Sequence, residues 1–244
     1  MSRHATRWVA YASPPNLYRL AGRLVPWFAT SAGLLLALGV FLGLFVAPTD
    51  FQQGDVYRVL FLHVPASWLG MWLYLLLGFY AALGWIFKAR SSSMMAAALA
   101  VTGAMFTGLS LATGSLWGRP AWGTWWVWDA RTTSTLILLF LYVGFITLQS
   151  AIDDPRRTDR AGAVIAVVGL VNVPIIYFSV QWWNTLHQGA TIRVAGETTM
   201  PGSMLTPMLI MVAGCWVYAI AVVLVRLRQL IHRRESIDGG LHGS

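Results

Sequence analysis

The sequence predicts an all-α polytopic membrane protein, a bundle of six transmembrane helices with a Trp-rich loop on the outer, periplasmic side. Hydrophobic residues make up 57% of the 244 residues and charged residues only 11%, whereas a soluble domain carries about 25% charged residues. Six apolar stretches are also long enough to cross a bilayer, which takes roughly 20 residues. This composition excludes a disordered chain, a disulfide-stapled secreted fold and a soluble nucleic-acid-binding protein.

The predicted spans cover, in chain order, approximately residues 24–47, 60–87, 94–116, 132–152, 161–180 and 204–225. The first is too long and too far from the N-terminus to be the apolar region of a signal peptide, so we interpret it as an uncleaved span. In the fifth, Asn172 and Pro174 favour a local kink over a complete break of the helix. Residues 1–244 therefore form a single membrane domain, with segments 1–23 and 227–244 outside the bilayer.

Lys and Arg residues set the orientation of the spans, because basic loops are retained in the cytoplasm. Thirteen of the 17 lie in segment 1–23, in the loops after the second and fourth spans and in the C-terminal tail. The other four are Arg58, Arg119, Arg131 and Arg193. Both termini are therefore predicted to be cytoplasmic, and the net charge of +8 is a signal of topology rather than a surface for nucleic acid.

The predicted outer loop 117–131 is exceptionally rich in tryptophan. It contains Trp117, Trp122, Trp125, Trp126 and Trp128. Tryptophans of an ordinary aromatic belt occur at both membrane interfaces, but the loops at 88–93 and 152–160 contain none. If 122–128 is helical, Trp122, Trp125 and Trp126 share one face. We therefore favour a flat apolar platform for a planar ligand over a belt.

Two histidines lie at the same predicted membrane level as this loop. His63 stands where the second span begins, and His187 follows the fifth span. A single histidine near an interface is usually a hydrogen-bonded surface residue, and we interpret His4, His232 and His242, near the cytoplasmic termini, in that way. A pair that flanks a Trp-rich loop instead favours axial ligation of haem iron by neutral imidazole.

Charged residues beside the loop suit the same ligand. Haem carries two propionates, and Arg58, Arg119 and Arg131 on the outer side could each bind a carboxylate through a guanidinium fork. For any one of them, contact with a lipid phosphate is the simpler interpretation. Asp129 could cap the fourth span, orient the Trp-rich loop or pair with Arg131, and the sequence leaves these alternatives open.

Other chemistry is absent or weakly indicated. Cys215 is the only cysteine, so the chain forms no internal disulfide and cannot attach haem covalently through paired cysteines. No nucleotide-binding loop, zinc-protease motif or hydrolase elbow occurs. The sequence therefore predicts no classical catalytic residue, and whether the protein is an enzyme stays open.

The run at 122–131, WGTWWVWDAR, resembles the WWD signature of the haem-handling superfamily of cytochrome c maturation. The length, the six spans and one histidine on each side of the run are similar to the CcmC family of haem-delivery proteins within it. The resemblance covers approximately residues 24–226. One departure is Thr132, where a leucine commonly follows the arginine; it affects only the start of the fourth span.

The resemblance implies a protein of the bacterial inner membrane that binds haem b non-covalently and transiently at its periplasmic face. His63 and His187 would be the axial ligands, and the five tryptophans of the loop would be the platform. Asp129, Arg131 and Arg58 fall at positions associated with haem retention or chaperone contact. The haem would pass, in a lyase-like transfer, to the periplasmic chaperone CcmE, with the ATP-binding cassette subunits CcmA and CcmB and the small membrane subunit CcmD as further partners.

Three alternatives are weighed against haem delivery. A larger relative with the same signature ligates haem directly to apocytochrome c, but six spans in 244 residues argue against it. A haem permease would need polar or ionisable residues at mid-span, and the apolar stretches hold almost none. A structural subunit would use the tryptophans to dock a partner protein, since Trp is common at interface hot spots.

Overall fold

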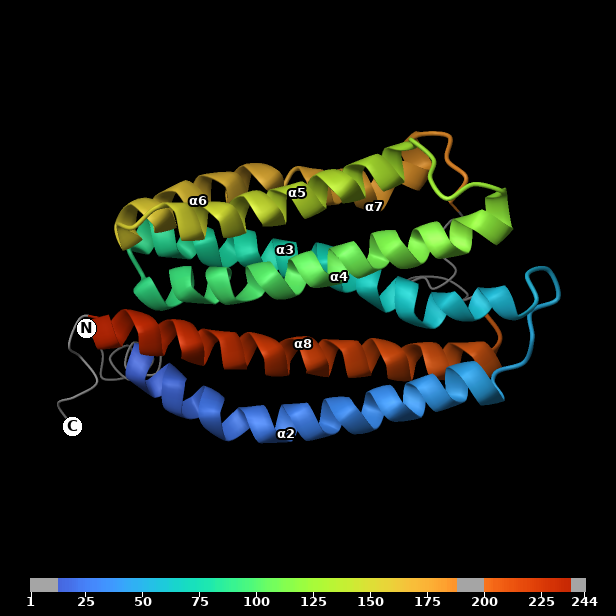
Figure 1. The fold of residues 1–244 in the computed structure, drawn as a ribbon, viewed down its shortest axis with the longest axis horizontal. Coiled ribbons are helices and arrows are strands. Elements are labelled where there is room, and N and C mark those ends of the chain that lie inside the picture. Colours follow the sequence, from blue (N-terminus) through green and yellow to red (C-terminus); the bar gives the residue numbers. More distant parts are fainter. Residues whose placement is uncertain (1–12, 188–199, 238–244) are drawn as a thin grey trace, which may run out of the picture.

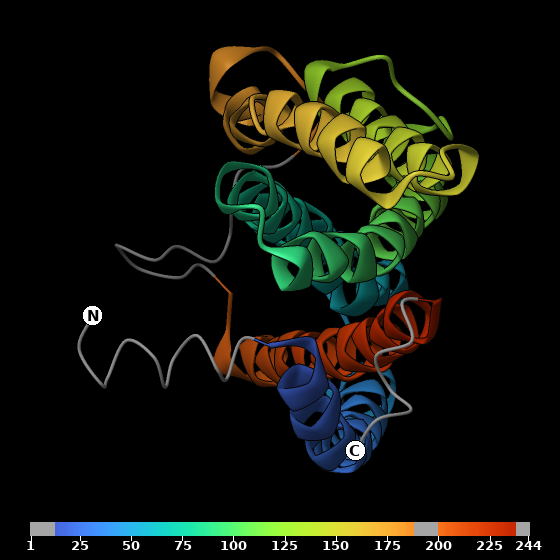
Figure 2. The same cartoon turned by 90° about the vertical axis from the view of Figure 1, so that its left-hand side faces the viewer.

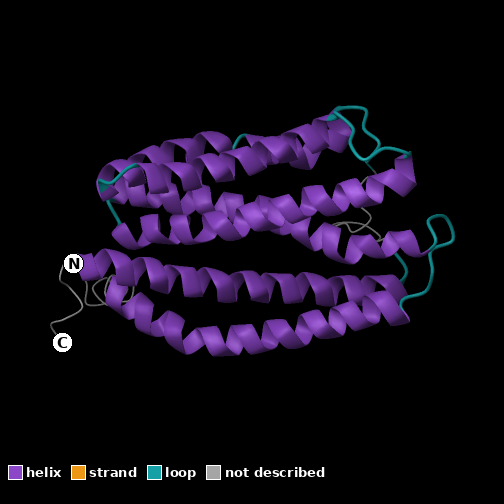
Figure 3. Cartoon of the chain, viewed as in Figure 1, coloured by secondary structure: helices purple, strands orange, loops and turns teal. Residues whose placement is uncertain are grey.

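The computed structural model describes residues 13–187 and 200–237, and these residues form a helical bundle without a β-strand (Figure 3). Six helical segments among them are long and apolar enough to cross a membrane, which confirms the predicted fold class. The parts of the terminal segments at 1–12 and 238–244, and Arg193 in the loop after the fifth span, lie outside the described residues.

The helices form three layers, which Figure 2 shows end-on. The first layer pairs α2 (Pro14–Phe41) with α8 (Gly202–Ile237), and α2 packs almost entirely on α8. The second pairs α3 (Leu60–Phe87) with α4 (Arg90–Trp122). The third contains α5 (Ala130–Ala151), α6 (Pro155–Gly169) and α7 (Asn172–Trp182).

Most helices extend beyond the predicted apolar stretches, because their polar ends continue the helix past the hydrocarbon core. A π-helical turn at Leu42–Val46 prolongs α2, and a 3₁₀ helix at Asp55–Val59 leads into α3. Asp129 and Asp154 are N-cap residues that accept hydrogen bonds from the backbone N–H groups of Thr132 and Arg157. The cap that we considered for Asp129 is therefore present.

The fifth span is interrupted only by a two-residue turn, Leu170 and Val171, between α6 and α7. Both residues keep right-handed helical backbone angles, and α6 and α7 together make one span, Pro155–Trp182, which agrees with the local kink favoured for Asn172 and Pro174. At this point the backbone hydrogen bonds join residues three apart instead of four, such as the one from the Val173 N–H to the Leu170 carbonyl at 3.2 Å. Proline supplies no N–H for the helical ladder. The Asn172 side-chain amide donates to the Ser134 carbonyl of α5 at 2.9 Å and so joins this point of the span to the neighbouring helix.

Buried tyrosines join the second and third layers. The Tyr142 hydroxyl donates to the Gly70 carbonyl at 2.8 Å, and the Tyr74 hydroxyl donates to the Ile165 carbonyl at 3.1 Å. The two rings meet edge to face with centroids 4.9 Å apart. Because buried polar groups are costly when unpaired, these contacts fix how α3, α5 and α6 lie against one another.

The start of α2 and the end of α8 lie at one end of the bundle, and the connections 47–54, 123–129 and 183–187 lie at the other (Figure 1). We call the latter the tryptophan end. At the opposite end, Arg234 of α8 makes a paired ion contact with both carboxylate oxygens of Asp159 in α6, at 2.9 and 3.0 Å. The predicted sites all lie toward the tryptophan end.

Candidate functional site

The tryptophan-rich segment 117–131 is part helix and part loop: residues 117–122 are the last turns of α4, residues 123–129 form a loop, and α5 begins at Ala130. The α4 helix ends at Trp122, since Gly123 has a left-handed φ of 78°, which favours glycine and stops the helix. Trp122, Trp125 and Trp126 therefore do not lie on one helix, so the condition on which their shared face depended is not met. The Trp125 and Trp128 side chains are 56% and 76% exposed.

Trp126 is more enclosed than its neighbours in the loop. Its ring meets the Trp128 ring edge to face at 5.4 Å between centroids. Its indole Nε1 atom is buried and has no hydrogen-bond partner. A buried donor without a partner costs free energy, so a ligand or water that accepted this proton would stabilise the loop.

His187 lies against Asp129, and the pair joins the loop after α7 to the first turn of α5. The His187 Nδ1 atom is 3.0 Å from the Asp129 Oδ2 atom, and the Asp129 side chain is only 5% exposed. The Thr185 hydroxyl donates to the same carboxylate oxygen and accepts from the His187 backbone N–H at 3.0 Å. Asp129 thus caps α5 and orients His187 at the same time.

The protonation of this pair follows from its surroundings. Burial opposes ionisation of Asp129, but hydrogen bonds from Thr185 and Thr132 outweigh it and lower the pKa of Asp129 to about 2. Burial also lowers the pKa of His187 below 6.5, although its hydrogen bond to Asp129 opposes the shift. At neutral pH a neutral imidazole therefore donates its Nδ1 proton to a carboxylate, which leaves Nε2 as a free base.

His63 lies within α3, not in a loop, because this helix begins at Leu60. Its Nδ1 atom is 3.1 Å from the Thr113 hydroxyl of α4. The ring fits over Gly114, where an added Cβ atom would lie 3.0 Å from the His63 Cε1 atom. His187 and Arg131 are close enough to His63 to interact with it electrostatically. The fold thus brings the two predicted histidines to one region.

Each histidine has a tryptophan of α4 at its edge. Trp117 meets His63 edge to face at 5.8 Å between ring centroids, and Trp122 meets His187 at 4.8 Å. Trp117 is fixed further by its indole N–H, which donates to the Gln53 side chain at 2.7 Å. These two tryptophans support the imidazoles, whereas Trp125 and Trp128 are exposed.

The predicted arginines at this end are engaged with the protein. Arg58 donates to the Gly43 carbonyl at 2.7 Å and to Asp55 at 3.0 Å. Arg119 donates to the Gly123 carbonyl. Arg131 reaches α7, where it donates to the Ser179 hydroxyl at 3.2 Å and to the backbone carbonyls of Ile176 and Tyr177 in the middle of that helix.

Sequence reasoning missed the residues that hold the imidazoles: Thr113, Gly114, Thr185 and Gln53. Thr185 stands two residues before His187, a spacing at which a hydroxyl can bond the nearby backbone, and this was the one available signal. Thr113 lies 50 residues from His63, and only the packing of α3 on α4 brings the two together.

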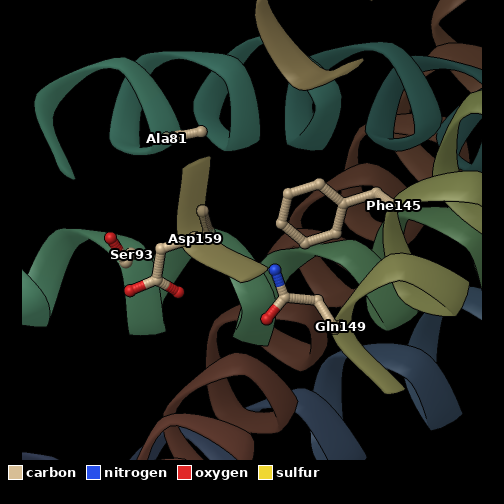
Figure 4. Close-up of a pocket in the computed structure, with 6 residues that line it drawn as sticks. Ala81, Ser93, Phe145, Gln149 and Asp159 are labelled. Carbon is tan, nitrogen blue, oxygen red and sulfur yellow. The ribbon is translucent and has the colours of Figure 1, made fainter. Parts of the chain in front are cut away.

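A recess lies between α3, α4, α5 and α6, and it includes none of the residues of the histidine and tryptophan site (Figure 4). It has no room for a water molecule and is lined by Ala81, Ser93, Ala96, Phe145, Gln149 and Asp159. It has neither histidine nor tryptophan in its lining. Among the described residues, no three His, Cys, Asp or Glu side chains cluster in a way that could hold a metal ion.

These features define a class of polytopic membrane protein: six spans, two carboxylate- or hydroxyl-anchored histidines, and a tryptophan-rich loop between them. The family model named Heme exporter protein C (CcmC) matches residues 7–239, so the chain belongs to the CcmC family.

Curated relatives agree with this assignment over most of their length. Heme exporter protein C of Escherichia coli K12 is 44% identical over 225 residues, 92% of this chain and 91% of the relative. The protein of the same name from Bradyrhizobium diazoefficiens is 42% identical, over 92% of this chain and 85% of the relative. That from Paracoccus denitrificans is 36% identical, over 92% and 93%.

Proposed function

We propose that this chain binds haem at the tryptophan end, with His63 and His187 as axial ligands, and delivers it to the chaperone CcmE during maturation of c-type cytochromes. The observation that carries the proposal is the matched pair of imidazoles. Each has its Nδ1 atom beside an oxygen acceptor and a tryptophan at its edge. Family membership and the relatives' name, Heme exporter protein C, support a role in haem handling.

The donor set suits haem iron. A neutral histidine ligates through one ring nitrogen while its other N–H donates to a carboxylate or another oxygen. Two such nitrogens satisfy the two axial positions of a haem, and the surrounding indoles provide an apolar face for the macrocycle. The haem would be haem b, held without a covalent bond, as a cargo that leaves the protein.

The remaining site residues take supporting roles in the proposal. Trp117 and Trp122 hold the imidazoles in place, while Trp125, Trp126 and Trp128 border the macrocycle and the approaching chaperone. Arg58 and Arg131 provide positive charge for the propionates, and Asp129 acts through His187. The exposed indole of Trp128 suits a protein contact, because Trp is enriched at interface hot spots.

The proposed setting is the bacterial inner membrane, with both termini cytoplasmic and the tryptophan end periplasmic. The excess of basic residues on the terminal side supports this orientation. The lone Cys215 is buried, so cysteines introduced one at a time can be labelled against a low background. With an impermeant maleimide on intact spheroplasts, we expect labelling of Phe51→Cys and none of Lys88→Cys until the membrane is opened. The reverse pattern would overturn the orientation.

The test of haem binding is the visible absorption spectrum of the detergent-purified protein. We expect low-spin haem in the wild type and its loss in the His63→Ala/His187→Ala double variant, with each single variant retaining less haem. His232→Ala, which changes an exposed histidine at the far end of α8, serves as the matched control. Normal loading of CcmE by the double variant would overturn the proposal.

The same preparation separates the alternatives. A docking subunit would bind no haem in any variant but would still copurify with CcmA, CcmB, CcmD or CcmE through the exposed tryptophans. A permease would move haem across vesicles that lack CcmE. Support for a conduit is weak, because the interior hydroxyls of Thr107 and Thr113 donate to carbonyls of their own helix.

A further inference from the structure

We infer that the two histidines are unequal ligands, and that Thr113 is the positioning residue of His63, which holds it less firmly than Asp129 holds His187 and so leaves His63 the exchangeable one. The inference rests on the proposed haem-binding function and adds to it which ligand leaves the iron. It starts from the oxygens that lie beside the two imidazoles.

The hydroxyl groups around His63 indicate which of its ring nitrogens carries the proton. Thr113 donates its proton to the Leu109 carbonyl, 2.7 Å away, so its oxygen can only accept from His63 Nδ1. The Ser67 hydroxyl has two partners closer than the His63 ring, the His63 carbonyl at 2.8 Å and the Ser110 hydroxyl at 2.5 Å, and either hydroxyl of that pair can be the donor. A threonine hydroxyl has one proton and two lone pairs. His63 is therefore the Nδ1–H tautomer.

This accounting leaves Nε2 of His63 as the free base. The nearest hydroxyl to it is that of Ser67, at 3.5 Å, which is too long for a hydrogen bond of ordinary strength. The Ser67 proton also has closer acceptors than Nε2, namely the His63 carbonyl oxygen and the Ser110 hydroxyl. The lone pair of Nε2 is thus available to a metal.

His187 presents the same tautomer through a different partner. Its Nδ1 proton goes to the ionised carboxylate of Asp129 at 3.0 Å, whereas that of His63 goes to the neutral hydroxyl of Thr113 at 3.1 Å. Hydrogen bonds to charged acceptors are roughly twice as strong as neutral ones. They also raise the basicity of the imidazole as a metal ligand.

The contrast assigns a different role to each histidine. His187 keeps its bond to iron throughout transfer, and His63 gives up its bond when an incoming ligand arrives. The exchange breaks one bond from iron to His63 Nε2 and forms one bond to the new ligand, with no change in oxidation state. An incoming histidine of a chaperone or a small ligand such as carbon monoxide would take the same position.

The first test uses haem-free protein labelled with ¹⁵N-histidine. We expect the His63 signal, identified by its absence from His63→Ala, to show a protonated Nδ1 and an unprotonated Nε2. Thr113→Val, which removes the acceptor at nearly constant volume, should lose this preference, and Thr113→Ser should restore it. An unchanged tautomer in Thr113→Val would overturn the role of Thr113.

The second test adds carbon monoxide to the reduced, haem-loaded protein. Thr113→Val should bind carbon monoxide about three- to tenfold faster than wild type, the factor expected for loss of a neutral hydrogen bond. Thr113→Ser should match wild type. In the resonance Raman spectrum of the adduct, Asp129→Asn should shift the iron–carbon stretch, because His187 is the ligand opposite carbon monoxide, and Thr113→Val should not.

The outcomes separate the inference from the function on which it rests. A shift of the iron–carbon stretch in Thr113→Val, with none in Asp129→Asn, would mean that His187 is the ligand that leaves. This result would overturn the inference but not the proposed function. Wild-type rates of carbon monoxide binding and wild-type Raman spectra in both variants would also overturn the inference but not the proposed function. A wild-type protein that takes up no haem, even when haemin is added, would overturn the proposed function and this inference with it.

Discussion

Replacing Asp129 with asparagine tests the proposed haem site at its most constrained point. The new side chain keeps one oxygen for the Thr132 N–H and remains a good N-cap, because Asn and Asp are similar in that role. Its amide nitrogen, however, turns a donor toward His187 Nδ1. The imidazole then favours accepting at Nδ1 and carrying its proton on Nε2, and this preference has to be overcome before Nε2 can bind iron.

The size of the effect follows from the hydrogen bond that is lost. A bond to a charged group contributes about 1.5–3 kcal/mol, which corresponds to roughly 10- to 100-fold in affinity, the usual range when the hydrogen-bonding partner of a metal ligand is removed. Titration of haemin into haem-free protein, followed by the low-spin absorption bands, should therefore show about 10- to 100-fold weaker binding in Asp129→Asn.

A matched control separates this effect from helix capping. Asp154 caps α6 as Asp129 caps α5, accepting from a backbone N–H at the same distance of 2.8 Å, but it has no histidine beside it. Asp154→Asn should leave haem affinity unchanged. Wild-type affinity and a low-spin spectrum in Asp129→Asn would refute the reasoning about the tautomer, and equal losses in both variants would point to the cap.

Three further predictions concern stability and protonation. Gly103→Ala should destabilise the protein by about 1–3 kcal/mol in thermal melts, because its Cβ would overlap the buried Tyr142 ring, whereas Gly108→Ala on the same helix has open space and should be neutral. Arg131→Lys should speed amide exchange in α7 without changing it in α3, since an ammonium group lacks the planar fork that bridges the two helices. The pKa of Asp129 is lowered from 3.8 to about 2, so the stability that its ionised form contributes is fully present above pH 3.8 and is lost as the pH falls through about 2. A ¹³C carboxyl titration of the haem-free protein checks this pKa. A titration midpoint near 3.8 would contradict the prediction.

The spans could be predicted from sequence because each is a long apolar run, and length and hydropathy alone decide whether a helix can cross a bilayer. The local kink near Asn172 and Pro174 could also be predicted, because proline interrupts the hydrogen-bond ladder of a helix. The partner at this point could not be predicted: the Ser134 carbonyl of α5 accepts from the Asn172 amide. That contact depends on tertiary packing.

In the candidate site, too, some features could be predicted from sequence and others depend on tertiary packing. The histidines and tryptophans could be selected because their residue types are unusual in a membrane-spanning chain. Whether residues 122–128 are helical could not be predicted, and they are not, since one glycine with positive φ ends α4 at that point. Thr113 carried no signal at all, because a threonine in an apolar span is ordinary until a ring nitrogen from another helix lies beside it.

The positions of these supports explain why the tryptophan-rich segment joins α4 to α5. The last turns of α4 hold His63 through Thr113 and meet both histidines through Trp117 and Trp122. The first turn of α5 holds His187 through Asp129, and its arginine also ties down the helix that precedes His187. The short loop 123–128 therefore links the support of one imidazole to the support of the other. A change in its length would move the two histidines relative to each other even though neither belongs to it, so the loop acts as a spacer between the proposed ligands as well as a surface for the cargo.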